Sequence, residues 1–494
     1  MYNLVSFLGL FGLCFIAWLF SEDRKVVAWR VIGIGIALQL LLGFLVFQFP
    51  PTRLFLEGFS QMLDAVFIAA DTGARFIFGA NLVPAPGMDP LIVRPLAEGM
   101  TSCPPPQEAI AGLAGYCGTT KLNYVLAFRA LPAVIFFSGL MALLYNLGII
   151  QVITNFFAKL FYRTMRLSGA ESLSGAANIF VGIEAAIVVK PYLAKMTRSE
   201  LCAILACCFG TSASSTLAIY VSFLKPVFPN ILGHLVSASI MAIPACFVIS
   251  KLLVPEVGKP LTMGGIPTEE EAKILEDQEK NLDPHNGDGE AEEPELEDVG
   301  GEKMHRVSPL DAAIVGALDG VKMAVAIAAV LILILGLVSL FNQFFGALGN
   351  IPGATGNIFK TYVNLGNIQG LIFYPVTLLT GVPFNESWEA SVIIGRRLLE
   401  TAIPPYQTLA AAAARPENPL SPRTVLIVSY ALSGFAHLAS VGIFVGGTIA
   451  LAPSRRQDIS ELGWKALFAG TLATLMIACI AGIFDNGSPS ILGG

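Results

Sequence analysis

The sequence is poor in the residues on which most enzymes and metalloproteins depend. Only 13% of its 494 residues are charged and four are histidines, and Cys207-Cys208 has no further ligand at metal-binding spacing. This pattern argues against a zinc site. No GxxxxGK[ST] motif occurs, so ATP-driven transport is not expected. No Ser/His/Asp or dicarboxylate constellation lies at useful spacing, so we expect neither an enzyme nor a cofactor, and we expect no nucleic-acid partner.

Hydrophobic residues make up 54% of the chain instead. Stretches of about 20 apolar residues are long enough to cross the hydrocarbon core of a bilayer. The sequence therefore predicts an all-α polytopic membrane protein with about eight transmembrane helices, whose partner is the lipid bilayer. The predicted spans are residues 3–20, 31–49, 127–147, 201–223, 231–253, 321–341, 425–451 and 464–484.

The net charge of −6 hides a strong asymmetry. Residues 269–302 hold fifteen acidic residues against two lysines, a net charge of −13, so the rest of the chain carries +7. A segment of this composition buries too little apolar surface to fold alone. We interpret residues 256–305 as a solvated cytoplasmic linker between two membrane halves.

Basic residues set the predicted orientation. Arg24, Lys25 and Arg30 join the first two spans, and the positive-inside rule places such a loop in the cytoplasm. The N-terminus is then outside. Amphipathic helices are predicted at 52–79 on the outer surface and at 152–167 on the inner surface.

Residues 169–223 are apolar but contain three interruptions. These are Glu184, the Lys190-Pro191 pair, and a hydroxyl cluster of Thr211, Ser212, Ser214, Ser215 and Thr216. An ionisable group inside an apolar segment marks a substrate or ion site by default, and irregular backbone at that depth must be buried in protein or line a cavity. We predict a re-entrant hairpin followed by an interrupted helix, together forming half of a solute site.

The second half of the chain repeats this pattern. A second hairpin is predicted at 385–409, and Pro405-Tyr406 corresponds to Pro191-Tyr192. The segments 209–219 and 433–443 follow these pairs in the same order, and the two hairpins enter from opposite faces. Inverted repeats with discontinuous helices are typical of secondary transporters.

Long stretches also resemble the concentrative nucleoside transporter family over nearly the whole chain. They include LPAVIFFSGLMALLYNLGIIQ, SGAESLSGAANIFVG, GVPFNESW, LSPRTVLIVSYALSGFA and GGTIALAPSRRQDISELGWKALFAGTLATLM. The resemblance implies a homotrimer in the cell inner membrane, with a scaffold that holds a mobile transport part. It also implies coupling to Na+ or, as in some bacterial members, to H+.

The domain organisation follows from the spans and the resemblance together. Residues 1–150 are predicted as scaffold spans with an outer interfacial helix, 151–255 as the first transport half, 256–305 as the linker, 306–345 as a scaffold span and 346–494 as the second transport half.

The resemblance places a sodium site on Asn178, Val181, Thr211 and Ser212. An amide oxygen, hydroxyls and unwound backbone carbonyls suit a small hard cation. The alternative is that these groups only satisfy backbone atoms freed at helix breaks.

The predicted substrate site departs from the family pattern. Gly182-Ile183-Glu184 stands where the family has Gly-Gln-Thr-Glu, and Thr401-Ala402-Ile403 stands where it has Asn-Glu-Phe, with Glu400 nearby as the substitute carboxylate. The family's Phe-Ala-Asn-x-x-Ser is present as a similar series in which the amide is a histidine. The predicted substrate residues are Gly182, Ile183, Glu184, Thr216, Glu400, Phe435, His437 and Ser440.

Several alternatives stay open at this point. His437 either contacts the solute, carries a coupling proton or packs as a structural residue, because imidazole titrates near neutral pH. Glu184 is either functional or paired with Lys190. The favoured function is an ion-coupled symporter that imports nucleosides or a related small polar solute by alternating access. The alternatives are a transporter of the same fold for another metabolite, or a non-transporting receptor or scaffold.

Overall fold

The computed structural model describes most of the helical part of the chain. The described residues are 2–49, 51, 58, 66, 68–79, 82–83, 91–95, 116–121, 126–180, 182, 184–212, 214–263, 265, 296–299, 302–305, 308–348 and 363–487. Most of the predicted outer helix at 52–79 and most of the acidic linker lie outside them.

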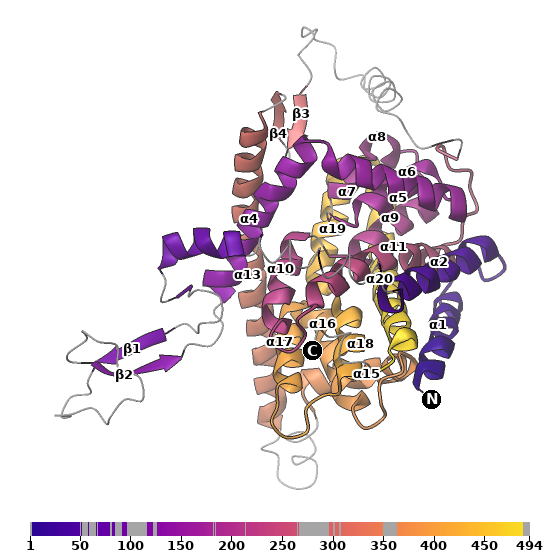
Figure 1. Ribbon diagram of the computed structural model, residues 1–494. Helices are drawn as coiled ribbons and strands as arrows, with labels where there is room; N and C mark the ends of the chain where they lie inside the picture. The colour runs from indigo at the N-terminus through magenta and orange to yellow at the C-terminus, as the bar shows by residue number, and fades with distance from the viewer. Residues whose placement is uncertain are drawn as a thin grey trace.

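The described elements are almost all helices (Figure 1). In chain order they are α1 (Tyr2–Leu19), α2 (Trp29–Phe47), β1 (Leu91–Pro95), β2 (Tyr116–Lys121), α4 (Leu126–Asn146), α5 (Ile149–Met165), α6 (Gly169–Ala177), α7 (Glu184–Ile187), α8 (Lys190–Leu193), α9 (Arg198–Gly210), α10 (Ser214–Leu224), α11 (Ile231–Leu253), β3 (Leu296–Val299), β4 (Glu302–His305), α13 (Pro309–Leu348), α15 (Leu365–Leu379), α16 (Ser387–Glu400), α17 (Ile403–Ala413), α18 (Pro422–Leu432), α19 (Leu438–Leu451), η1 (Pro453–Arg455) and α20 (Arg456–Phe484).

The predicted helical membrane fold is confirmed, with differences in how the spans are built. Within the described chain, five helices are long and apolar enough to cross a bilayer, namely α1, α2, α11, α13 and α20. The predicted span at 127–147 is α4, which meets α5 at a bend of 76°. The spans predicted at 201–223 and 425–451 are each two shorter helices. Whether the hairpins re-enter the membrane stays a prediction.

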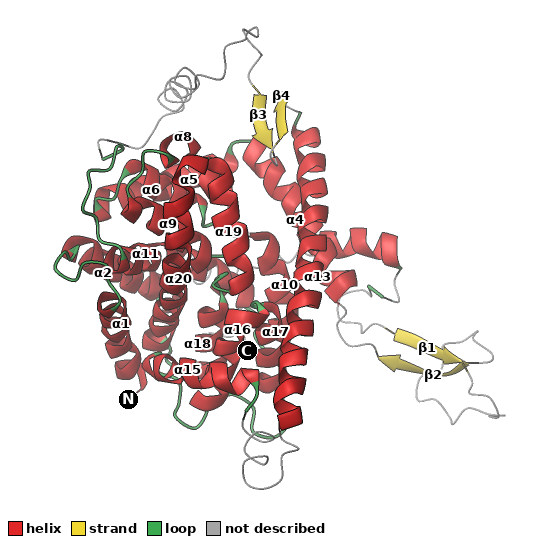
Figure 2. Cartoon of the chain, turned by 180° about the vertical axis from the view of Figure 1, so that it is seen from behind, coloured by secondary structure: helices red, strands yellow, loops and turns green. Residues whose placement is uncertain are grey.

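Two short antiparallel hairpins lie at the edge of the helical body (Figure 2). β1 pairs with β2, and β3 pairs with β4. The second pair falls at the end of the acidic segment that we expected to be unstructured. Residues 296–299 and 302–305 pair through backbone hydrogen bonds that do not require a buried apolar core, and the interpretation of the segment as a solvated linker stays a prediction.

Local sequence fixes where the half-helices of the site begin. Ser168 and Glu171 form a capping box at the start of α6, and Thr197 and Glu200 form another at the start of α9. Ser421 caps α18, which has proline as its first residue. These residues satisfy backbone N–H groups that a helix start leaves without partners, so each helix begins at a defined point.

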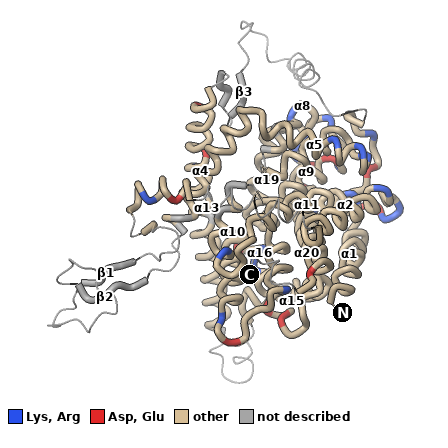
Figure 3. Tube along the Cα trace, viewed as in Figure 1, with Lys and Arg blue, Asp and Glu red and all other residues tan. Residues whose placement is uncertain are grey.

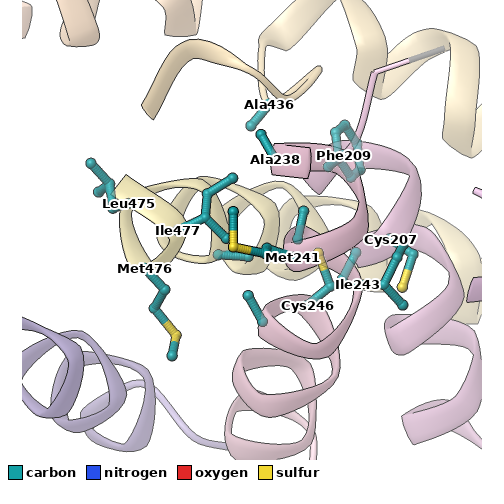
Figure 4. Close-up of a cluster of buried hydrophobic side chains, with 14 of the residues drawn as sticks. Cys207, Phe209, Ala238, Met241, Ile243, Cys246, Ala436, Leu475, Met476 and Ile477 are labelled. Carbon is teal, nitrogen blue, oxygen red and sulfur yellow. The ribbon is translucent and has the colours of Figure 1, made fainter. Parts of the chain in front are cut away.

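The core forms where α20 packs against α1, α9, α11 and α18. Figure 4 shows side chains from α9, α11 and α20, including Cys207, Met241, Cys246 and Ile477, in one buried cluster. The cysteines at 14, 202, 207, 208, 246 and 479 are unpaired thiols, most of them buried, and in this environment they act as small hydrophobic residues. α4 and α13 pack together along one side of the molecule (Figure 1).

Charged residues are concentrated at the ends of the helices. Lysine and arginine gather at the end that holds α5, α8 and the α1–α2 connection, opposite the N-terminus (Figure 3). Arg455 donates to the carbonyls of Ala194 (3.1 Å) and Met196, and Arg198 bonds Glu22 and Asp458. The segments predicted to share the cytoplasmic face therefore lie together at one end.

Candidate solute and cation site

The site is built where two broken helices cross. α9 ends at Gly210 and α10 begins at Ser214, whereas α18 ends at Leu432 and α19 begins at Leu438. The two breaks bond directly, because the Phe435 N–H donates to the carbonyl of Thr211 at 3.1 Å and Ser212 Oγ donates to the carbonyl of Ser433. The two halves of the chain thus meet through their irregular backbone.

Glycine allows this close crossing. A Cβ at Gly434 would lie 2.7 Å from the carbonyl oxygen of Gly210 and 2.8 Å from that of Phe209. On α20, a Cβ at Gly470 would lie 2.5 Å from Cβ of Phe209. A larger residue at either position would force the breaks apart.

The predicted cation ligands include one buried acceptor without a partner. Asn178 caps the C-terminal end of α6, is fully buried, and donates through Nδ2 to the carbonyl of Ser174 at 3.1 Å. Its Oδ1 has no hydrogen-bond partner among the described residues. A buried acceptor left unsatisfied costs about 1–3 kcal/mol, so this oxygen is suited to a ligand that the chain itself does not supply.

Thr211 and Ser212 lie on the break itself. Thr211 Oγ1 donates to the carbonyl of Cys207 at 2.8 Å, and Ser212 Oγ donates across to α18. A hydroxyl that donates its hydrogen keeps lone pairs, so both oxygens remain able to accept a cation. α6 packs against α9, and the segment after Asn178 reaches the end of α9 at Gly182, whose carbonyl accepts from Cys208. Val181 lies outside the described residues.

The tip of the first hairpin is described only in part. The Gly182 carbonyl accepts from the N–H of Ala185 at 3.1 Å and from the Cys208 thiol at 4.0 Å. Glu184 begins α7, which packs against α19. The side chain of Glu184 and the whole of Ile183 lie outside the described part, so their predicted contacts stay predictions.

Three predicted substrate residues come together at the start of α19. His437 caps this helix, since its Nδ1 accepts from the N–H of Ser440 at 3.2 Å. Ser440 Oγ lies 3.0 Å from each ring nitrogen. The ring of Phe435 meets the imidazole edge-on at a centroid distance of 5.9 Å. The sequence thus predicted this cluster, but it did not predict the cap.

Glu400 is placed differently from the expectation of a free carboxylate. It ends α16 with its side chain 3% exposed, and Arg396 holds it through Nε to Oε1 at 3.0 Å and Nη2 to Oε2 at 2.7 Å. Such a bidentate pair fixes the position of the carboxylate and uses part of its acceptor capacity. The predicted contact of Glu400 with substrate stays a prediction.

Thr401 is a candidate that the sequence analysis left out of the site. It forms the tip between α16 and α17 with φ +68° and ψ −178°, is buried, and its Oγ1 has no partner among the described residues. This backbone region is essentially restricted to glycine and costs on the order of 1–3 kcal/mol for other residues. The sequence could have indicated Thr401, because it stands where the family has the asparagine of its Asn-Glu-Phe motif.

An aromatic pair joins the two halves beside the crossing. Tyr220 of α10 and Tyr406 of α17 stack at a centroid distance of 4.5 Å. Tyr406 donates its hydroxyl to the carbonyl of Ser429 at 2.9 Å. Thr216, one turn before Tyr220, is also buried. The match between Pro191-Tyr192 and Pro405-Tyr406 in the sequence thus indicated a residue, Tyr406, that packs at the site.

Comparison with known families confirms the resemblance found in the sequence. The model of the "Na+ dependent nucleoside transporter C-terminus" matches residues 234–482, about half of the chain. The chain belongs to the Na+-dependent nucleoside transporter family. The N-terminal model of this family matches residues 8–81, and a model described as "Gate: Nucleoside recognition" matches residues 127–227.

Relatives of this nucleoside transporter family member come from bacteria and vertebrates. The chain is 31% identical to Solute carrier family 28 member 3 of Mus musculus, covering 98% of this chain and 59% of the relative. It is 30% identical to the nucleoside permease NupC of Helicobacter pylori, covering 98% of both chains. The chain therefore spans about 59% of the mouse relative but nearly the full length of the bacterial one.

Solved structures of this family share the fold. CNTnw in an inward-facing, substrate-bound state matches with a TM-score of 0.74 and 32% identity, over 98% of both chains. An outward-facing form of a CNTnw variant matches with a TM-score of 0.76. With its apolar helices and bacterial relatives, the chain is a multi-pass protein of the cell inner membrane.

Proposed function

We propose that this chain is a cation-coupled secondary transporter that imports a nucleoside or a related small polar solute by alternating access. The observation that carries the proposal is the crossing of two broken helices. It is supported by the Oδ1 of Asn178, which is buried without a partner among the described residues. Broken helices that meet at a repeat interface are how secondary transporters build a solute site.

We propose Na+ as the coupling ion, bound by Asn178, Thr211, Ser212 and the Val181 carbonyl. Amide, hydroxyl and carbonyl oxygens are hard ligands, which suit an alkali cation. Membership of a family described as Na+ dependent also supports sodium as the coupling ion. Proton coupling is the alternative outcome of the experiment below.

The remaining organisation is proposed on the same basis. The predicted scaffold elements α4 and α13 pack on each other, and the hairpins and broken helices form the rest of the body. We propose that α4 and α13 belong to the scaffold of a homotrimer, while residues 151–255 and 346–494 form the moving transport part.

The test is uptake into sealed proteoliposomes. Radiolabelled uridine and adenosine are offered with an inward Na+ gradient, with choline in its place, and with a proton gradient. We expect uptake driven by Na+ and lost in Asn178→Ala, whose side chain cannot coordinate the ion. Thr448→Ala, buried on α19 and bonded only within its own helix in the described structure, serves as control. Folded protein without uptake under either gradient contradicts the proposal for nucleosides.

A transporter of the same fold for another solute is the second candidate. The pairing of Glu400 with Arg396 favours it, because a ribose hydroxyl would have to share this carboxylate with the guanidinium. A melting-temperature screen of nucleobases, modified nucleosides and small polar metabolites in the presence of Na+ distinguishes the two. Stabilisation by a solute without a ribose favours this second candidate.

A further inference from the structure

Arg397 is buried without an ionic partner. It comes from the last turn of α16 and is the largest fully buried side chain among the described residues. Its Nη1 donates to the carbonyl of Ala431 and to Thr474 Oγ1 at 3.0 Å. Its Nη2 has no hydrogen-bond partner in the described part of the chain, and no described carboxylate forms an ion pair with it.

The guanidinium is held by the end of a half-helix. Ala431 is the penultimate residue of α18, and the last carbonyls of a helix carry partial negative charge that favours a cation. A buried charge without compensation costs several kcal/mol. The C-terminal end of α18 thus forms a place that is suited to a positive charge.

The first half of the chain contains the counterpart of this place. In the first hairpin, Asn178 follows the end of α6, and Gly182, four residues later, accepts from Cys208 in the last turn of half-helix α9. In the second hairpin, Arg397 lies in the last turn of α16 and bonds the C-terminal end of half-helix α18. The place in the first half offers Asn178 Oδ1, an acceptor without a partner among the described residues. The place in the second half holds the guanidinium of Arg397, a cationic donor supplied by the chain itself.

We propose that Arg397 is a built-in cation that takes, in the second half, the place that transported Na+ takes in the first. This inference rests on the proposed sodium site at Asn178. It follows that each protomer binds one sodium ion, and that the α18–α19 break stays formed throughout the cycle while the α9–α10 region depends on the ion.

The test uses purified protein in lipid nanodiscs and needs no knowledge of the solute. Binding of radioactive Na+ to the wild type is expected to follow a hyperbola with one ion per protomer. Arg397→Ala is expected to melt roughly 5 °C or more below the wild type in choline buffer. Millimolar guanidinium ion is expected to restore most of that loss by filling the vacated place.

Matched variants keep the test decisive. Arg397→Lys retains the charge and is expected to keep both the wild-type melting temperature and the hyperbola. Arg415→Ala removes an exposed arginine that pairs with Glu389 and is expected to show no guanidinium effect.

Three results would overturn the inference: two sodium ions per wild-type protomer, an unchanged melting temperature in Arg397→Ala, or a loss that guanidinium does not repair. If Arg397→Ala does not fold, loss of sodium binding in folded Arg397→Lys overturns it instead. If the wild-type protein binds no sodium, the proposed coupling ion is wrong. In that case the guanidinium experiment still tests, by itself, whether Arg397 acts as a built-in cation.

Discussion

At the residue scale, the polar groups of the site divide into those already bonded within the chain and those without a partner. Glu400 is paired with Arg396 and His437 with Ser440. Asn178 Oδ1 and Thr401 Oγ1 have no partner among the described residues. The bonded groups fix the geometry of the hairpins and breaks, so the open acceptors are the better candidates for contact with a transported species.

His437 is expected to act as a helix cap and not as a proton carrier. Its Nδ1 must keep a lone pair to accept from the Ser440 N–H, and a proton on that nitrogen would remove the cap. Asparagine caps equally well, whereas leucine loses about 1 kcal/mol. We expect His437→Asn to keep the wild-type melting temperature and the pH profile of uptake, and His437→Leu to be less stable. A pH profile that flattens in His437→Asn contradicts this.

The Arg396–Glu400 pair is expected to be structural. Arg396→Met leaves the Glu400 carboxylate buried and unpaired, which costs about 3–5 kcal/mol. The double variant Arg396→Met with Glu400→Leu removes both charges and is expected to recover much of that loss. Melting temperatures of the single and double variants give the coupling energy. Additive losses would show that the two side chains do not stabilise each other.

At the element scale, the chain breaks two helices where an ordinary membrane span would continue. The sequence predicted both breaks, because hydroxyls, glycines and a histidine interrupt apolar runs at 209–219 and 433–443. It did not predict that the breaks bond to each other through Thr211 and Phe435. Backbone hydrogen bonds carry no side-chain signature, so this contact could not be read from residue types.

Gly434 is expected to be essential for the crossing. In Gly434→Ala the new methyl group meets the carbonyls of Gly210 and Phe209, and neither can move without breaking its helix end. We expect a loss of about 1–3 kcal/mol together with loss of uptake. Gly442→Ala on α19 is the control, because its Cβ meets nothing within 4 Å. Equal melting temperatures for the two variants would contradict the packing argument.

At the scale of the whole molecule, two arginines hold the ends of α20. Arg198, the first residue of α9, bonds Asp458 near the start of α20 at 2.6 Å. Arg423, in the first turn of α18, bonds Asp485, which caps its end, at 2.9 Å. These arginines occupy equivalent positions of the inverted repeat. α20 is therefore fixed at both ends by residues from opposite halves.

The end of α20 near the α1–α2 connection is expected to respond to acid. Burial alone would raise the pKa of Glu22, but hydrogen bonds from Lys465 and Arg198 outweigh it and hold the pKa below the ordinary value of 4.5. A carboxyl with a lowered pKa stabilises the fold above its ordinary pKa and loses that contribution as the pH falls through the lowered value. We expect the wild type to have a higher melting temperature than Glu22→Gln at neutral pH. This difference in melting temperature is expected to shrink below about pH 4.5. Glu417→Gln in the exposed loop after α17 is the control, and a difference that does not change with pH contradicts the assignment.

The sequence predicted the fold better than the site. Apolar spans, broken helices and the repeat were visible because the bilayer and the backbone restrict residue types at those positions. The partner of Glu400 was not visible, since the i and i+4 spacing to Arg396 is common on any helix. Arg397 was not predicted as a site residue, because its contacts come from residues 34 and 77 positions away in the chain.

The position of α20 also determines the order in which the chain can be assembled. Among the described helices α20 is translated last, yet Asn3 of α1 donates to the carbonyls of Ile483 and Asp485 at 3.0 and 2.8 Å. The end of α9 lies against Gly470, and Gly434 in the second break lies against Thr474. The ribosome therefore releases both broken helices before the helix that supports them exists. Until α20 is inserted, Arg397 lacks Thr474, and the nascent chain must be protected from misassembly and degradation for that interval.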